Sequence, residues 1–293
     1  MTTQTIKRRY NQYSIEFEDM ICEQYLQGKS SVMLQKEHKI SPDTVLKIVR
    51  SRGHTPRTFK DIMTKYTFDH SFFESIDTEA KAYFLGLLVA DGSLSDIEVI
   101  LELAAKDRHI IEQFVSCLKG NNKIHDKRKA TTNYLNRESF TARLNLRSDK
   151  MIKDLNTLGL ERRKSYNTII PKISEHLERH FWRGLLDGDG HISFYQSKYK
   201  TKLANDKTKC YGYKILEVGI CGHINTANAF VEFLNKHNIE TPGVRPDKAI
   251  YQVRVRTKDC PKFLNLIYSD SDPKLRLKRK YEKYLEYLEY INL

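Results

Sequence analysis

The sequence is poor in cysteine and has no long apolar run. Its five cysteines are an odd number with no CxxC spacing, so neither a disulfide framework nor a cysteine-based zinc site is expected. No stretch approaches the length needed to span a bilayer, and the start, MTTQTIKRRYNQYS, lacks the hydrophobic segment of a secretion signal. We therefore expect a soluble intracellular protein with free thiols and no membrane partner, in a bacterial or phage-host cytoplasm or in an organelle.

Acidic residues are outnumbered by basic ones. Lys and Arg total 50 against 37 Asp and Glu, which gives a net charge of +13 and a pI near 9.3. Such a balance favours a polyanionic partner, with nucleic acid first among the candidates. Hydrophobic residues make up 40% and aromatic residues 11% of the chain, so it is expected to form true cores. A length of 293 residues suggests two or three packed units.

Histidine clusters of the metal-binding kind are also missing. His176 and His180 could share one helical face, but no cysteine or third histidine lies nearby to complete a site. We expect both on a solvated helix surface.

Residues 1–58 predict three short helices with a tight turn before the last, as in a helix-turn-helix. Gly28 can end the first helix, and Ser41 followed by Pro42 suits the start of the third. The third helix would direct three polar side chains toward a DNA major groove, namely those of Thr44, Lys47 and Arg50. A small bundle used only for protein contacts is the alternative.

A basic linker is expected at 59–75, and Arg57 just before it could follow phosphates. From about residue 76 the chain looks duplicated, with halves at 76–168 and 169–293. YFLGLLVADG, at 83–92, and FWRGLLDGDG, at 181–190, each read as a helix followed at once by a strand.

Small residues lie at i and i+4 in each of these helices. They are Gly86 and Ala90 in the first, and Gly184 and Gly188 in the second. Glycine inside a helix costs about 1 kcal/mol relative to alanine, so it needs a compensating reason such as close packing of another backbone. If the helix faces that carry these small residues pack against each other, the C-terminal ends of the two helices come together.

Those ends carry Asp91 and Asp189. Acids at a helix C-terminus oppose the macrodipole, and two nearby carboxylates repel each other. A divalent cation, Mg²⁺ or Mn²⁺, would relieve both conflicts, with the Ala90 and Gly188 carbonyls as further oxygen ligands. The alternative is that each Asp-Gly pair only turns the chain at a helix end, but its repetition favours a site.

Several strand-like segments alternate basic or amide side chains with aliphatic ones. Period two would place the polar side chains on one face of a sheet, as rows of one charge sign suited to a concave nucleic-acid surface. These side chains are Lys123, Lys127, Arg143, Asn145, Arg147, Gln252, Arg254 and Arg256, together with His191, Ser193 and Tyr195 after the second motif. The segment QSKYKTKLANDKTKCYGY reads as a long basic hairpin loop.

The stretches FLGLLVADG (84–92) and WRGLLDGDG (182–190) resemble the two copies of the LAGLIDADG motif in single-chain homing endonucleases. The resemblance covers roughly 76–293. It implies an α+β fold of two pseudo-symmetric αββαββα halves that form a DNA-binding saddle, here preceded by the small all-α helix-turn-helix unit. It also implies that Asp91 and Asp189 are the metal ligands, whereas Asp187, opposite Val89 in the first copy, is not one.

The family further places a lysine near each active site, which falls on Lys164 and Lys278 here. The resemblance implies a sequence-specific DNA endonuclease that uses metal to make a staggered double-strand break by phosphodiester hydrolysis. Its partner would be double-stranded DNA with a long recognition site, bound by a monomer with internal two-fold pseudo-symmetry. Because no protein-splicing ending is present, we expect a free-standing or intron-encoded enzyme. An intron RNA maturase and a non-cleaving transcription regulator are the alternatives.

Overall fold

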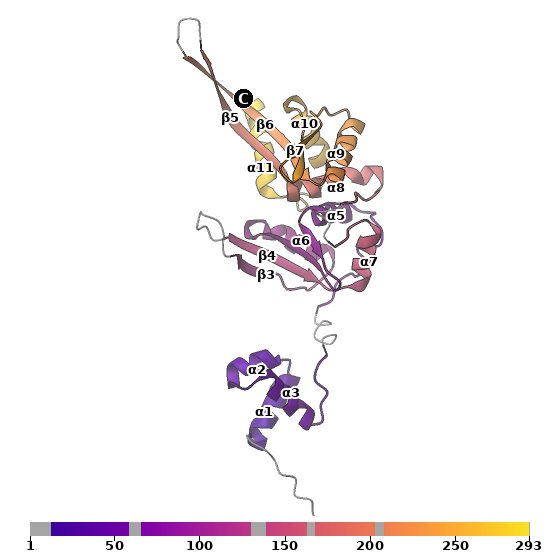
Figure 1. The fold of residues 1–293 in the computed structure, drawn as a ribbon, viewed down its shortest axis with the longest axis vertical. Coiled ribbons are helices and arrows are strands. Elements are labelled where there is room, and N and C mark those ends of the chain that lie inside the picture. Colours follow the sequence, from indigo (N-terminus) through magenta and orange to yellow (C-terminus); the bar gives the residue numbers. More distant parts are fainter. Residues whose placement is uncertain (1–12, 59–65, 130–138, 163–167, 203–207, 293) are drawn as a thin grey trace, which may run out of the picture. The chain divides into compact units, whose positions relative to one another are not determined.

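The computed structural model describes residues 13–58, 66–129, 139–162, 168–202 and 208–292. The chain forms two compact units, Met1–Lys65 and Tyr66–Leu293 (Figure 1). Within the described residues, no helix is long and apolar enough to cross a membrane.

The first unit is a bundle of three helices, α1 (Ile15–Leu26), α2 (Ser31–His38) and α3 (Pro42–Ser51). Serine side chains cap all three N-termini, and Gly28 adopts a φ of 108° after α1, as its place in the sequence predicted. The helices bury a small core of Ile21, Cys22, Tyr25, Leu34, Ile40, Val45, Ile48 and Val49. The three predicted helices are therefore present, and DNA binding by this unit stays a prediction.

The second unit contains two halves of the same element order. The first half comprises α5 (Glu79–Asp91), β1 (Gly92–Leu94), β2 (Val99–Ala104), α6 (Arg108–Cys117), β3 (His125–Lys129), β4 (Ser139–Leu146) and α7 (Asp149–Thr157). The second comprises α8 (Glu175–Asp189), β5 (Gly190–Lys202), β6 (Thr208–Gly222), α9 (Ile224–Lys236), β7 (Val244–Asp247), β8 (Ile250–Arg254), α10 (Cys260–Tyr268) and the added α11 (Lys278–Ile291). The antiparallel sheets share one topology, β1-β2-β4-β3 and β5-β6-β8-β7, which confirms the α+β class with two αββαββα halves.

Two boundaries differ from the sequence prediction. The basic segment expected as a loop after the second motif is mostly strand, because β5 and β6 pair continuously from Gly190 opposite Ile220 to Lys202 opposite Thr208. They extend past the rest of their sheet as a two-stranded ribbon (Figure 1). The end of the expected linker belongs to the second unit, since Phe72 and Phe73 are buried in its core.

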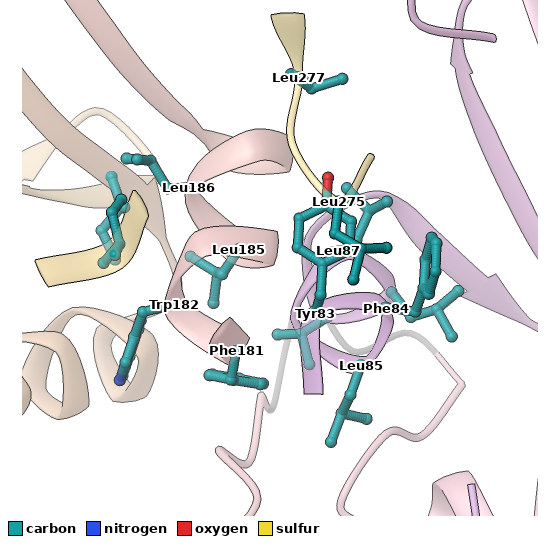
Figure 2. Packing of buried hydrophobic residues seen from close by; sticks show 14 of the residues in the cluster. Tyr83, Phe84, Leu85, Leu87, Phe181, Trp182, Leu185, Leu186, Leu275 and Leu277 are labelled. Carbon is teal, nitrogen blue, oxygen red and sulfur yellow. The ribbon is translucent and has the colours of Figure 1, made fainter. Parts of the chain in front are cut away.

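One hydrophobic core runs through both halves. On one side Phe84 of α5 stacks on Phe114 of α6, with ring centroids 4.3 Å apart. On the other side Trp182 of α8 packs against Phe230 and Phe233 of α9. Figure 2 shows how side chains of α5 and α8 spread into the core from the two adjacent helices. The motif helices therefore join the halves and fill them at the same time.

The two motif helices touch backbone to backbone. A Cβ atom placed on Gly86 would lie 2.0 Å from the carbonyl oxygen of Phe181, and one on Gly184 would lie 2.0 Å from that of Tyr83. The contacts are reciprocal, because each glycine meets the residue three positions before the other glycine. Farther along, a Cβ on Gly188 would lie 2.2 Å from the Cβ of Ala90. The small residues therefore mark the line along which the helices approach.

Arg183 adds a buried polar contact between the halves. Its guanidinium is 0% exposed and lies 2.6 Å from a carboxylate oxygen of Glu79 in α5. It also donates to the backbone carbonyls of Ile267 and Leu275, and to Nδ1 of His180 at 2.7 Å. A buried ion pair that loses one partner typically costs about 3–5 kcal/mol, so the pair resists separation of the halves.

His180 corrects the expectation of a solvated surface position. His176 is exposed, but His180 is 4% exposed and accepts a hydrogen bond from Arg183. Burial, together with the neighbouring Arg183 charge, lowers the pKa of His180 from 6.5 to about 3. The imidazole must stay neutral to accept from a guanidinium.

Substituting Gly184 by alanine is expected to lower the free energy of unfolding by about 3 kcal/mol or more, because a methyl group there overlaps a backbone carbonyl that cannot rotate away. Urea unfolding of the purified variant measures this change. Gly222→Ala is the matched control, since its Cβ would meet Thr226 at an ordinary 3.5 Å, and it should stay within about 0.5 kcal/mol of wild type. Equal stability of the two variants would contradict the crossing.

Stability should fall as the pH drops from about 6.5 toward 3. The folded chain keeps His180 neutral down to a pKa of about 3, whereas the unfolded chain binds a proton near 6.5, so acid favours unfolding in this window. Urea unfolding at several pH values tests this on wild type and His180→Asn. The variant should lose less stability than wild type between these limits. Parallel curves would mean that the histidine is not held neutral.

Candidate active site and nucleic-acid interface

Asp91 and Asp189 are the last residues of α5 and α8, and both are exposed. The crossing brings these helix ends together. Oδ2 of Asp91 lies 3.0 Å from the position that a Cβ on Gly188 would occupy, next to Asp189. A strand begins directly after each acid, at Gly92 and at Gly190. Each acid therefore lies between the motif helix of its half and the first strand of the sheet in that half.

The oxygen atoms at this meeting point suit a hard divalent cation. Within the described part of the chain, no group of three or more His, Cys, Asp or Glu side chains could hold a metal ion. An ion there would take the carboxylates of Asp91 and Asp189, the carbonyls of Ala90 and Gly188, and water or phosphate oxygens. Mg²⁺ binds in this manner, with few protein ligands and several waters. The donor set fits the expected metal.

A pocket of about 250 Å³ opens beside Asp189. Val89 and Ala90 line it from α5, and Cys221 and His223 line it from the second sheet and the start of α9. Both halves therefore contribute walls to the same space.

The buried lysine beside the end of α8 is neither of the two lysines that the resemblance implied. Lys164 lies outside the described residues. Lys278 is exposed at the first position of α11, whereas Lys280 is 4% exposed and reaches the end of α8. Its Nζ donates to three carbonyl oxygens there, each at 2.6 Å. Sequence reasoning missed Lys280, although Asp187, an acid inside an apolar helix, was a signal that a buried cation had to lie nearby.

Asp187 is buried, in contrast to the exposed Asp91 and Asp189. It is 1% exposed, and its Oδ2 accepts from the Tyr83 hydroxyl and from the Leu277 amide, both at 2.9 Å. Burial raises the pKa of Asp187, and the adjacent Lys280 opposes this rise. Burial and the Asp187 charge also hold the pKa of Tyr83 well above its usual value. Asp187 therefore joins α5, α8 and the segment before α11.

The polar face of the first sheet does not carry one charge sign. Asn145 of β4 and Arg147, one residue after it, donate to Glu98 at 2.9 and 3.3 Å, and Arg143 of β4 lies 3.5 Å from Glu102 of β2. The predicted rows of like charge are wrong here, because Glu98, just before β2, and Glu102, within it, lie beside the basic groups. Reading each strand alone could not show this.

The second sheet repeats the arrangement with Glu217 of β6. Arg254 donates to it at 2.9 Å, and His191 lies 3.2 Å away. Strand pairing makes Glu98 and Glu217 equivalent: Gly92 pairs with Leu101 and Gly190 with Ile220, and each glutamate lies three residues before that partner. Each half thus has an acid at the same place on its polar face.

The guanidinium of Arg57 is held within the first unit. It lies 4.2 Å from the centre of the Tyr25 ring and donates to the carbonyls of Gly28 and Lys29. These carbonyls follow the end of α1, where a cation is favourable. Arg57 therefore helps to hold the segment that follows α3, and its contact with phosphates stays a prediction.

Other predicted DNA-binding residues differ in exposure. Exposed residues are Lys47, Arg50, Lys123, Lys127, Tyr195, Arg254 and Arg256, and half-buried ones are Thr44, Arg143, Asn145, Arg147, His191, Ser193 and Gln252. Thr44 bonds to its neighbour Ser41, and Arg256 lies 3.6 Å from Glu240. Among described cysteines, free thiols are found at Cys22, Cys117, Cys221 and Cys260, which confirms that expectation for these four.

No protein-family model matches the chain, and no curated protein matches it. Solved structures with a similar fold include the LAGLIDADG meganuclease I-CpaMI bound to uncleaved DNA, at 13% identity over 74% of this chain and 92% of that one, with a TM-score of 0.49. The LAGLIDADG meganuclease I-AabMI bound to uncleaved DNA is 14% identical over 71% of this chain and 88% of that one, with a TM-score of 0.48. The homing endonuclease I-WcaI bound to its DNA recognition sequence is 16% identical over 79% of this chain and 96% of that one, with a TM-score of 0.46.

Proposed function

We propose that the chain is a sequence-specific DNA endonuclease that makes a metal-dependent, staggered double-strand break. The observation that carries the proposal is the placing of Asp91 and Asp189 at the adjoining ends of two crossing helices, each followed directly by a strand of its own sheet. Two acids related by pseudo-symmetry suit a duplex, whose two strands are also related by a two-fold axis. A monomer with a long recognition site follows from the internal duplication.

The carboxylates of Asp91 and Asp189 would hold Mg²⁺ or Mn²⁺ together with the Ala90 and Gly188 carbonyls. Such an ion activates a water and stabilises the leaving oxygen in phosphodiester hydrolysis. The protein's own part is to fix these oxygens at the ends of rigid helices. Lys278, exposed at the start of α11, could contribute a positive charge near a scissile phosphate.

Binding would come from the polar faces of the two sheets. Lys123 and Lys127 suit phosphates, and Arg143 and Arg254 can read guanine edges. The first unit would add Lys47 and Arg50, which α3 exposes. Neutralising phosphates releases counterions, so affinity should decrease steeply with salt.

The direct test incubates the purified protein with DNA from its own locus, with the intervening element removed. We expect double-strand cleavage in Mg²⁺ and none in EDTA. Asp91→Asn and Asp189→Asn should each lower the rate by about 100-fold or more, because each removes a charged oxygen from the site. Gel analysis of the products measures both effects.

Asp149→Asn is the control for these variants, since Asp149 is an exposed acid in the first turn of α7. It should cut like wild type. Specific binding without a metal-dependent cut would refute the nuclease and support a regulator. Selective binding to intron RNA would favour the maturase.

The paired glutamates predict how binding responds to charge removal. Glu98→Gln and Glu217→Gln should each raise affinity for a duplex of scrambled sequence by about threefold to tenfold, because one carboxylate no longer repels phosphates. The slope of log affinity against log salt should steepen by about 1 for Glu217→Gln, since Arg254 gains a phosphate partner. Fluorescence anisotropy at several salt concentrations measures both quantities.

Glu112→Gln is the matched control for charge alone, because Glu112 pairs with Arg108 on α6 and lies on neither strand face. It should leave both quantities near wild type. Weaker binding of the scrambled duplex by the two sheet variants would show that these acids do not oppose nonspecific binding.

A further inference from the structure

The end of α8 is held by the buried ammonium group of Lys280, which comes from α11. Its Nζ donates to the carbonyl oxygens of Leu186, Asp187 and Gly190, each at 2.6 Å, and lies 3.5 Å from that of Gly188. Carbonyls in the last turn of a helix have no donor within the helix, and a cation there also complements the helix dipole. An ammonium group has three protons to donate, and three short contacts use them all.

These contacts lie on both sides of Asp189. The carbonyl of Asp187 precedes this acid and the carbonyl of Gly190 follows it, so one side chain restrains the backbone before and after a candidate metal ligand. Lys280 is 4% exposed and has little freedom to leave. The restraint is therefore built into the folded chain.

Asp187 supplies the countercharge for Lys280. It is 1% exposed, and its Oδ2 already accepts from Tyr83 and Leu277. Its Oδ1 has no hydrogen-bond partner among the described residues. Burial lowers the pKa of Lys280 to about 8, and Asp187 is the neighbour that most favours its charged form. In the first motif Val89 stands at the matching position, so that helix end lacks this acid.

We propose that Lys280 is a positioning residue that fixes the end of α8, and with it the direction of the Asp189 carboxylate toward the metal. This inference rests on the proposed nuclease function. Lys280 donates to carbonyls at the end of α8, which carries Asp189, and Val89 of α5 stands where α8 has Asp187. The two strand cuts therefore depend on Lys280 to unequal degrees.

The test compares Asp187→Asn with the double variant Lys280→Met/Asp187→Asn. The double variant leaves no buried charge unpaired, and the Asn amide oxygen can still accept from Tyr83 and Leu277. Both variants are assayed on a supercoiled plasmid with the site that wild type cuts, and Asp187→Asn is the reference because it keeps Lys280 in place. The double variant should accumulate nicked circles, with the ratio of nicked to linear product rising about tenfold, because a small displacement of a catalytic group slows one cut.

Amide hydrogen exchange without metal or DNA gives a readout that does not require activity. In the double variant the amides of 188–190 should exchange about tenfold faster than in Asp187→Asn, and those of 90–92 should not change. Lys283→Met is the control on α11, since Lys283 is exposed and pairs with Glu286. It should match wild type in exchange and in products.

A double variant that exchanges and nicks like Asp187→Asn would overturn the proposal, and so would an equal slowing of both cuts. If the double variant does not fold, Lys280→Gln/Asp187→Asn takes its place, and exchange at 188–190 equal to that of Asp187→Asn would refute the positioning role. If wild type makes no metal-dependent cut, the proposed function fails by itself. The exchange measurements then still test the restraint by Lys280.

Discussion

The crossing of α5 and α8 is the constraint on which the rest of the second unit depends. Gly86 and Gly184 each meet the backbone of the other helix at a distance that leaves no room for a side chain. Because the contact is backbone to backbone, it fixes the helix ends more narrowly than a contact between flexible side chains would. Asp91 and Asp189 come together as a geometric consequence, and each sheet begins at a defined point beside them.

A contact this close excludes water, so a polar group buried beside it destabilises the fold unless it has a hydrogen-bond or ion-pair partner. Arg183 reaches Glu79 across the halves, His180 stays neutral to accept from Arg183, and Lys280 donates to backbone carbonyls at the end of α8. None of these groups could be replaced alone without leaving a buried charge or an unpaired donor. The buried network therefore supports the same helix ends that the glycines bring together.

Much of the fold could be predicted from the sequence because its signals are local or repeated. Helix caps and period-two alternation act within a few residues, and the doubled small-residue pattern by itself predicts that the two motif helices cross. The site was less predictable. Lys280 and Glu217 owe their roles to residues distant in sequence, Asp187 and Arg254, and strand alternation says nothing about the strand alongside. His180 was misplaced for the same reason, since its burial depends on packing across the halves.

The acids on the sheet faces have a physical use if the faces meet DNA. A surface with only basic groups gains affinity from any phosphate backbone, so its discrimination between sequences is small. Glu98 and Glu217 neutralise part of that charge and hold Arg147 and Arg254 in fixed directions. A cognate duplex would have to replace these internal bonds with equally good ones to base edges, whereas a wrong sequence would leave a carboxylate or guanidinium unpaired. Equivalent acids in both halves suggest that each half lowers nonspecific affinity by the same means.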